Sequence, residues 1–341
     1  MDLLIPGLLV YVATACVASG LVFLPSAALA EALPPGRTAW ETRLWFAALL
    51  LPHLLAAASV GYALRLHALD PVAWAVRARA VRHLSFWWVA QTPDAAYRLQ
   101  VIALIAAAAL LIGLLRPLFS LALAWRYARV LNRASVEVPE LGVWLTPLKR
   151  PWSACVGFLR GRVFVTQGLA QLLDAEELGA VIAHEQAHAR RGDNLRQLLA
   201  QAAFGPTVLM PTAHGAYRRL QASFERAADA EAVASGADGH ALASALVKAA
   251  RRLREFSGEP DEEPLRKRMA SRYREEFVAE RAQRLLEAAE DPPGGASPTR
   301  RLTLVIPAAL LLVLLAVASP LVPPTVRSLF ESVVAALSRA G

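Results

Sequence analysis

Long stretches without a charged side chain constrain this chain more than any other feature. Residues 3–30 contain no Asp, Glu, Lys or Arg, and three further apolar runs follow later in the chain. A helix needs about 20 apolar residues to cross a bilayer. We therefore expect four membrane-spanning helices, at about residues 3–25, 44–64, 99–120 and 301–323.

The first run has a competing interpretation as a secretory signal peptide, because Ala28-Leu29-Ala30 is similar to a cleavage site. However, the start of the chain carries Asp2 and no basic residue. The run is also longer than the roughly 7–15 residues of a signal-peptide core. We predict a membrane anchor. A proline at position 117 predicts a kink in the third span, with Arg116 near one membrane interface.

Basic residues near the membrane ends predict the orientation of the chain. Between the third and fourth runs they are Arg126, Arg129, Arg133, Lys149, Arg150, Arg300 and Arg301. We expect this stretch in the cytoplasm of a bacterial cell, both termini outside the inner membrane, and residues 324–341 as a short external tail. The loop between the second and third runs is also basic, and its tryptophans favour an amphipathic segment in the lipid interface.

Charged residues return over residues 126–300, which predicts a domain outside the membrane. Its patterns predict a mainly helical α+β fold inserted into a polytopic α-helical membrane protein. The expected strands are residues 136–138 and 161–166; the expected helices are residues 175–191, 213–234, 240–254 and 263–290, followed by a linker at 291–298.

The net charge of +8 does not predict a nucleic-acid site, because the basic stretch at residues 266–274 is flanked by glutamates. Such a pattern is typical of a salt-bridged, solvent-exposed helix. We therefore expect membrane lipid as a contact of this chain and no direct binding of nucleic acid.

The sequence His184-Glu185-Gln186-Ala187-His188 fits the H-E-x-x-H motif and lies on an expected helix. Residues four apart share a helix face, so both imidazoles can bind one zinc ion. Zinc lowers the pKa of a bound water to about 7, and a neighbouring carboxylate can take its proton. The motif predicts His184 and His188 as ligands and Glu185 as the general base. The alternative is a solvated helix face with two histidines.

A catalytic zinc site needs a third protein ligand and an open position for water. Glu225 and Asp229 are four residues apart on the expected helix 213–234. One carboxylate can therefore bind the metal while the other holds a ligand histidine from behind. We predict Glu225 as the third ligand and Asp229 as the supporting carboxylate. The alternative is an exposed acidic helix face.

Four further polar residues have candidate roles. His214 and Tyr217 precede Glu225 and are candidates for stabilising a developing oxyanion, although such residues more often pack or face solvent. Asp193 is expected to cap the helix that follows it. His53 lies within the second apolar run, where an ionisable side chain marks either a functional site or a hydrogen bond between helices.

The segment from about residue 151 to residue 229 resembles the BlaR/MecR-type membrane metallopeptidases, antibiotic-responsive proteases of bacterial signalling. The shared features are FLRGRV at 158–163, EEL at 176–178, HEQAHARRGD at 184–193, the Glu225–Asp229 pair, and the order of three spans, domain and fourth span. The resemblance implies one zinc ion bound by His184, His188 and Glu225, with Glu185 as the catalytic base. It also implies a zincin-like core in which the strand near Val163 lies beside the substrate cleft.

Two features depart from that family. The sequence contains no S-x-x-K motif, so we expect no acylation by β-lactams. Ala228 stands where the family usually has cysteine and resembles instead the Glu-x-x-Ala-Asp motif of HtpX-type proteases. Those proteases place membrane spans between H-E-x-x-H and the glutamate. Residues 189–224 carry several arginines and two prolines, and we expect no span there.

These observations predict a membrane-embedded zinc endopeptidase that cuts a cytoplasmic protein. The resemblance suggests a winged-helix repressor as the substrate and a role in signal transduction. One alternative is an HtpX-type quality-control protease with broad specificity. Another is a non-catalytic membrane scaffold that retains a zinc site.

Overall fold

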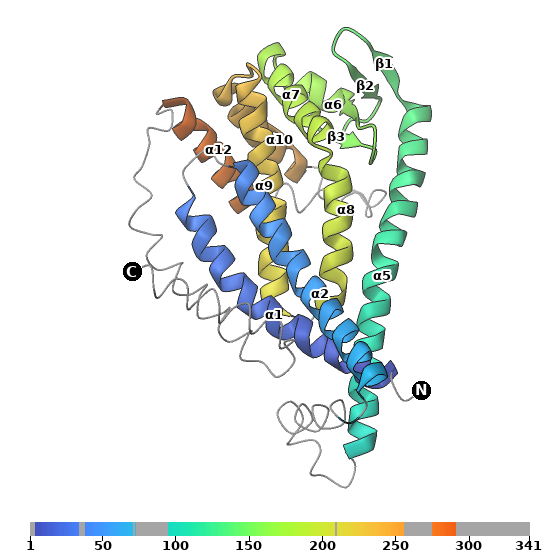
Figure 1. The fold of residues 1–341 in the computed structure, drawn as a ribbon. Coiled ribbons are helices and arrows are strands. Elements are labelled where there is room, and N and C mark those ends of the chain that lie inside the picture. The colour runs from blue at the N-terminus through green and yellow to red at the C-terminus, as the bar shows by residue number, and fades with distance from the viewer. Residues whose placement is uncertain are drawn as a thin grey trace, which may run out of the picture.

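The computed structural model describes residues 4–33, 38–70, 72, 95–208, 210–255 and 275–290. In this part of the chain, long helices form a bundle, and a small sheet with its covering helices lies at one end (Figure 1). The elements in chain order are α1 (Leu4–Ala32), α2 (Thr38–Leu69), α5 (Ala95–Ala134), β1 (Val136–Val138), β2 (Val143–Thr146), β3 (Ser153–Val156), β4 (Arg162–Thr166), α6 (Gln167–Leu172), α7 (Ala175–Arg191), α8 (Asp193–Phe204), the 3₁₀ turn η1 (Gly205–Thr207), α9 (Pro211–Ala234), α10 (Gly239–Glu255) and α12 (Glu275–Glu290).

Among the described residues, three helices are long and apolar enough to cross a membrane. They are α1 over Thr14–Ala32, α2 over Thr38–Leu69 and α5 over Ala107–Ala134. They overlap the first three predicted spans, and large apolar side chains such as Leu24, Leu54 and Phe119 are exposed on their outer surfaces. Such helices suggest association with a membrane. The fourth predicted span, residues 301–323, lies outside the described residues.

Helix α5 continues through Pro117 and forms one element from Ala95 to Ala134. The proline therefore does not end the helix. Close packing against neighbouring helices can stabilise a proline within a long apolar helix. Arg116 lies over the ring of Phe204, the last residue of α8, 5.7 Å from the ring centroid.

The sheet lies at one end of the helix bundle, and the ends of the apolar helices can be assigned to the two ends of the bundle (Figure 1). Helix α1 ends and α2 begins at the end that carries the sheet, whereas α2 ends and α5 begins at the opposite end (Figure 1). Side-chain contacts agree, because Arg226 of α9 pairs with Glu41 in the first turn of α2. The end of α1 and the start of α2 therefore lie on the same side of the bundle as the domain after α5 (Figure 1).

The sheet has four strands in the order β1-β2-β4-β3. Strand β2 pairs in parallel with β4, with Leu145 opposite Val165, while β1 and β3 pair antiparallel to their neighbours. Strand β3 is an edge strand that contacts helix α7. The sequence patterns predict β1 and β4 but not β2 and β3. Strand β4 lies inside the sheet, whereas the resemblance expected the strand near Val163 to border the substrate cleft.

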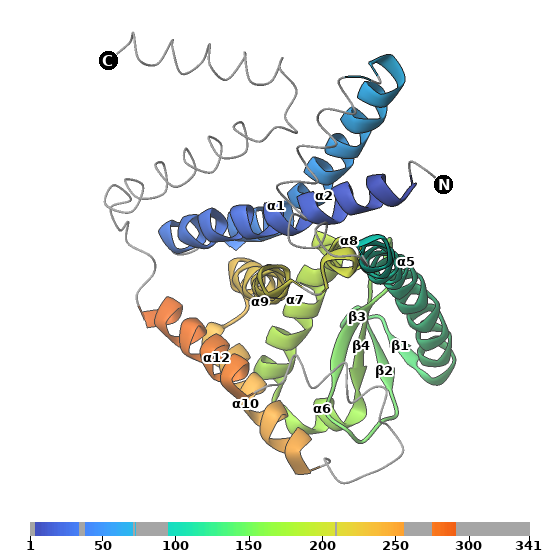
Figure 2. The ribbon, with the colours of Figure 1, turned by 90° about the horizontal axis from the view of Figure 1, so that it is seen from below.

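Helix α7 packs on β3, β4, α9 and α10 and forms the centre of the domain (Figure 2). Its first turn is a capping box in which Asp174 accepts hydrogen bonds from the N–H groups of Glu176 and Glu177 while Glu177 accepts from the Asp174 N–H. Gly192 ends the helix in the left-handed conformation, with φ of 64°. A core of buried apolar residues joins α7 to α10 and α12 through residues that include Ile182, Leu242 and Leu285.

Helices α8 and α9 form a hairpin that lies among the apolar helices α1, α2 and α5 (Figure 2). A second apolar core consists of Trp45, Ala48, Leu49, Ala200, Ala203, Ala216, Leu220 and Phe224. In addition, Ser19 of α1 shares a 2.9 Å hydrogen bond with Thr212 of α9. Neither hairpin helix is a candidate span. The expectation for residues 189–224 was nevertheless incomplete, because this segment packs alongside the candidate spans.

Helix α12 covers the second half of the charged helix predicted at residues 263–290, and the basic stretch predicted to be solvent-exposed, residues 266–274, lies outside the described residues. Val278, Arg281, Ala282 and Leu285 are buried on the side that packs against α10 and α9. Residues 256–274 lie outside the described residues. The charges of α12 therefore cover one face only, and an arginine is buried on the other.

We predict that Gly113→Ala destabilises the protein, because a Cβ atom at this position would lie 2.6 Å from the Pro206 nitrogen. Overpacking of this kind costs about 1–3 kcal/mol. The matched control is Gly61→Ala, where a Cβ meets no atom within 4 Å. That change should be neutral or stabilising by up to about 1 kcal/mol through helix propensity. Thermal unfolding in detergent compares the two; equal effects would contradict close contact between α5 and the hairpin.

We also predict a pH-dependent contribution from Glu177, which accepts hydrogen bonds from Ser244 and the Asp174 N–H and pairs with Lys248. Burial raises the pKa of Glu177, but the hydrogen bonds and the charge of Lys248 together lower it by more, so the pKa lies below its usual 4.5. The stabilisation is therefore present at neutral pH and is lost as the pH falls through the folded-state pKa. Glu177→Gln should lower stability by about 1–2 kcal/mol at pH 7.

Unfolding curves from pH 7 to pH 3 check this dependence. The difference between Glu177→Gln and the unmodified protein should shrink at acidic pH. Glu255→Gln, an exposed carboxylate on α10, is the control and should have little effect throughout. A difference that does not change with pH would show that Glu177 acts through packing rather than charge.

Candidate metal centre

Helix α7 presents His184 and His188 from one face, because residues four apart differ by little more than one helical turn. Both side chains are buried, and their rings meet edge to face with centroids 4.8 Å apart. The capping box and Gly192 hold the two ends of this helix. The H-E-x-x-H segment is therefore an internal part of the domain and not a solvated helix face.

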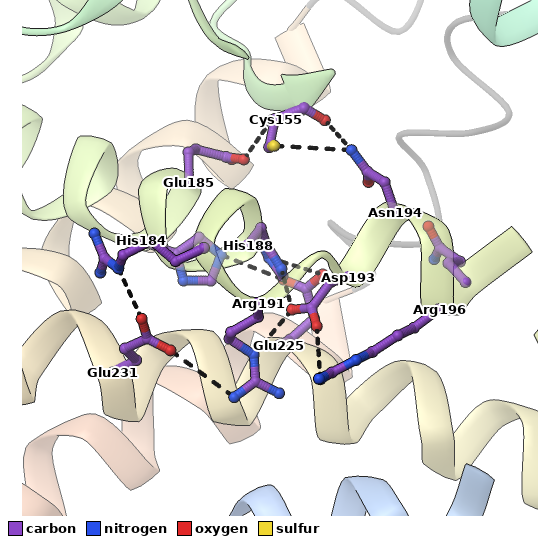
Figure 3. A network of polar contacts seen from close by, with 12 residues as sticks. Cys155, His184, Glu185, His188, Arg191, Asp193, Asn194, Arg196, Glu225 and Glu231 are labelled. Atoms are coloured by element: carbon purple, nitrogen blue, oxygen red, sulfur yellow. Dashed lines mark hydrogen bonds and ion pairs between the residues drawn. The ribbon is translucent and has the colours of Figure 1, made fainter. Parts of the chain in front are cut away.

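Glu225 reaches the two histidines from α9. Its Oε2 lies 3.6 Å from His184 Nε2, and its Oε1 lies 3.7 Å from His188 Nε2. One ligand atom from each of the three residues lies within 4.8 Å of the others, and all three side chains are buried (Figure 3). Two imidazoles and one carboxylate match the donor set of a catalytic zinc site with one open position. This cluster could hold a metal ion.

A carboxylate lies behind each histidine. His184 Nδ1 lies 2.8 Å from Asp229 Oδ1, and His188 Nδ1 lies 2.9 Å from Asp193 Oδ2. A carboxylate at Nδ1 fixes the tautomer and leaves Nε2 for a metal. The prediction for Asp193 was wrong: Gly192 is the N-cap residue of α8 and provides no side-chain cap. Asp193 faces His188 and also accepts a hydrogen bond from Arg191 (Figure 3).

Arg281 of α12 lies behind the carboxylates of α9. It donates two hydrogen bonds to Asp229, from Nε at 2.8 Å and from Nη2 at 2.6 Å, and its Nη1 lies 3.1 Å from Glu225 Oε2. Burial raises the pKa of Asp229, but the charges of Arg281 and His184 lower it to about 2. Asp229 is therefore ionised at neutral pH. The sequence patterns gave no sign of this arginine, because it lies 52 residues from Asp229 along the chain and no local spacing connects the two.

Glu185 is anchored to the edge strand β3. Ser153 Oγ donates a 2.9 Å hydrogen bond to one carboxylate oxygen, and the Cys155 N–H donates a 2.8 Å bond to the other. Asn194 in turn donates to the Cys155 carbonyl at 2.9 Å (Figure 3). The strand beside Glu185 is therefore β3, not the strand near Val163. Ser153 was missed because its strand was not predicted.

The structure does not bring His214 and Tyr217 to the metal cluster. Both pack against Phe204, with ring centroids 4.7 Å away in each case. His214 precedes Glu225 by 11 residues on α9, which corresponds to about 16 Å along the helix axis. These side chains therefore belong to the hairpin tip and do not support the predicted role in stabilising an oxyanion.

A surface cavity of about 440 Å³ lies on the other side of α7. Gln186, Ala189 and Arg190 line it, and these positions face away from the two histidines on the helical wheel. The remaining lining residues are Glu137, Gly142, Trp144, Gly161, Arg162 and Val163. This cavity is therefore separate from the metal cluster.

Comparison with protein-family models relates part of this chain to a known family. Residues 149–279 match peptidase family M48. This segment contains the cluster of His184, His188 and Glu225, and it ends two residues before Arg281. The match supports a metallopeptidase in this part of the chain, and zinc dependence is implied by the family. It does not confirm the narrower resemblance to the BlaR/MecR type.

We predict that Asp193→Asn weakens zinc binding 10- to 100-fold, because loss of a carboxylate behind a ligand histidine typically has this effect. The control is Glu231→Gln, which removes a carboxylate that pairs with Arg190 in the same network but does not contact either histidine. Competition with a chromophoric chelator measures both affinities. Unchanged zinc affinity in Asp193→Asn would contradict its supporting role.

Proposed function

We propose that this chain is a membrane-embedded zinc-dependent endopeptidase. The observation that carries the proposal is the buried convergence of His184, His188 and Glu225, each supported by a further charged side chain. The position of Glu185 on the same helix, within the segment that matches peptidase family M48, adds the base that peptide hydrolysis requires.

When bound, zinc would polarise the peptide carbonyl and make its water ligand acidic. Glu185 then accepts a proton from the attacking water and passes it to the leaving amine. Its two hydrogen bonds to β3 use only part of the accepting capacity of an ionised carboxylate, which has about four lone-pair sites. The anchored side chain is therefore positioned and still able to take a proton.

We place the substrate chain in an extended conformation beside β3. An edge strand offers main-chain groups to an added strand, and β3 is the edge strand that contacts Glu185. The N–H and carbonyl of Cys155 are already used by Glu185 and Asn194. The N–H and carbonyl of Trp152 bond to Thr166, so pairing with a substrate would involve the main-chain groups of Ser153.

We propose that the catalytic domain lies on the cytoplasmic side of an inner membrane. The basic residues that follow the third apolar run support this orientation. Arg226 of α9 also contacts Glu41 in the first turn of α2. The apolar run of α2 begins a few residues later, at Leu44. Peptide bonds would then be cut close to the membrane surface.

A cytoplasmic repressor is our first candidate for the substrate, on the basis of the resemblance to BlaR/MecR-type proteins alone. The packing of the α8–α9 hairpin among the candidate spans favours a second candidate, an HtpX-type quality-control protease, because that type also places the segment between H-E-x-x-H and the glutamate in the membrane region. Digestion of unrelated unfolded membrane proteins by the purified enzyme would support the second candidate. Cleavage restricted to one partner would support the first.

We predict that the unmodified protein and Glu185→Gln each retain about one zinc ion, and that only the unmodified protein cleaves peptide bonds. Glu225→Ala should lose most of its zinc, because it removes one of three ligands. Metal analysis and peptide cleavage in detergent test these expectations. Glu176→Gln, an exposed carboxylate on the same helix, is the control and should behave as the unmodified protein.

The other outcomes separate the alternatives. Zinc retained in Glu225→Ala would remove Glu225 from the ligand set. Cleavage by Glu185→Gln would remove Glu185 as the base. Zinc without cleavage in the unmodified protein, with every tested substrate, would favour the non-catalytic scaffold.

A further inference from the structure

We propose that Arg281 is a positioning residue of the metal centre, which holds Glu225 and Asp229 in the orientation that binds zinc. This inference rests on the proposed zinc site and adds a residue to it from outside the segment that matches the family, residues 149–279. The side chain is only 4% exposed, although arginine is among the residues least often buried. A buried guanidinium of this kind requires partners for its charge and its donors.

The contacts of Arg281 use the shape of the guanidinium group. Two parallel donors bind both oxygens of Asp229, and the third nitrogen lies 3.1 Å from Glu225 Oε2. A planar fork can hold two carboxylates at once, whereas the compact ammonium group of lysine cannot reproduce the bidentate pair. Arg281 therefore links the third ligand to the carboxylate that holds the first ligand, His184.

This link has a direct consequence for the metal site. Glu225 and Asp229 are buried one helical turn apart on α9, and two ionised carboxylates so placed repel each other. Arg281 offsets that repulsion and restrains Glu225 Oε2. Without it, Glu225 could turn away from the histidines, or Asp229 could leave His184. Either change would weaken zinc binding without removing a ligand.

A second pair of charges fixes α12 against α9. Arg226, next to Glu225, lies 3.7 Å from Glu280, next to Arg281. Each helix therefore contributes one arginine and one glutamate at adjacent positions, and each arginine pairs with the glutamate of the other helix. Arg226 also pairs with Glu41 of α2, so this contact continues to an apolar helix. The position of Arg281 is thus set by packing around the metal centre and not by chance contact of a long surface side chain.

The test compares Arg281→Gln and Arg281→Lys with Arg284→Gln in the full-length protein. Arg284 lies on the same helix, is exposed and pairs with Glu280, so its loss controls for general effects on α12. Zinc affinity is measured by chelator competition, and thermal unfolding without metal shows whether each variant folds. We expect both Arg281 variants to bind zinc at least 10-fold more weakly and Arg284→Gln to remain within about twofold.

A spectroscopic measurement separates positioning from general stability. Co²⁺ in place of zinc gives an absorption spectrum that depends on the ligand geometry. We expect this spectrum to change in Arg281→Lys, which retains the charge, and to be unaltered in Arg284→Gln. If Arg281→Gln does not fold, the lysine variant decides the question by the same two measurements.

The outcomes distinguish this inference from the proposed function. Zinc binding by the unmodified protein, with unchanged affinity and Co²⁺ spectrum in a folded Arg281 variant, would overturn the role of Arg281 and leave the peptidase proposal in place. Absence of zinc binding by the unmodified protein would overturn both. Weaker zinc binding in the Arg281 variants alone would support the inference, whatever the substrate proves to be.

Discussion

Compensation of buried carboxylates is the interaction on which the cluster of His184, His188 and Glu225 depends. Glu185, Asp193, Glu225 and Asp229 are all buried, and each accepts hydrogen bonds or pairs with a cation or an imidazole. An ionised carboxylate left unpaired in a protein interior costs several kcal/mol. The cluster can therefore form only when strand β3 and helices α7, α8, α9 and α12 are all packed in place, so the fold and the site stabilise each other.

Helix α9 connects this cluster to the apolar bundle. Its first half packs against α1 and α2 through residues such as Ala216 and Leu220, and its second half carries Glu225 and Asp229. A helix transmits the position of one end to the other because its backbone hydrogen bonds make it stiff over these distances. Glu225, the proposed third ligand, is consequently positioned by contacts that include helices outside the sheet-containing domain, among them the hydrogen bond from Thr42 of α2 to the Ser223 carbonyl.

Local rules of helix formation account for the parts of the site that could be predicted. The four-residue spacing of His184 and His188, the capping box at Asp174 and the stop at Gly192 all depend on residues close together in the sequence. Glu225 was predicted from chemistry, because a zinc site needs a third ligand and Asp229 follows one turn later. The same local reasoning was wrong for His214 and Tyr217, since closeness to Glu225 along the chain becomes distance along the helix axis.

The spacing of the apolar residues and of the two histidines therefore determined which segments can enter a membrane and which side chains share a helix face, because helical periodicity is a local property. The tertiary structure alone decided which distant groups complete the centre. Asp193, which was predicted as a helix cap, pairs with His188. Ser153 of an edge strand donates to Glu185, and Arg281 of α12 donates to Asp229. Each of these contacts joins groups on different elements, and the pairing of buried charges follows from how the elements dock, which no local pattern encodes.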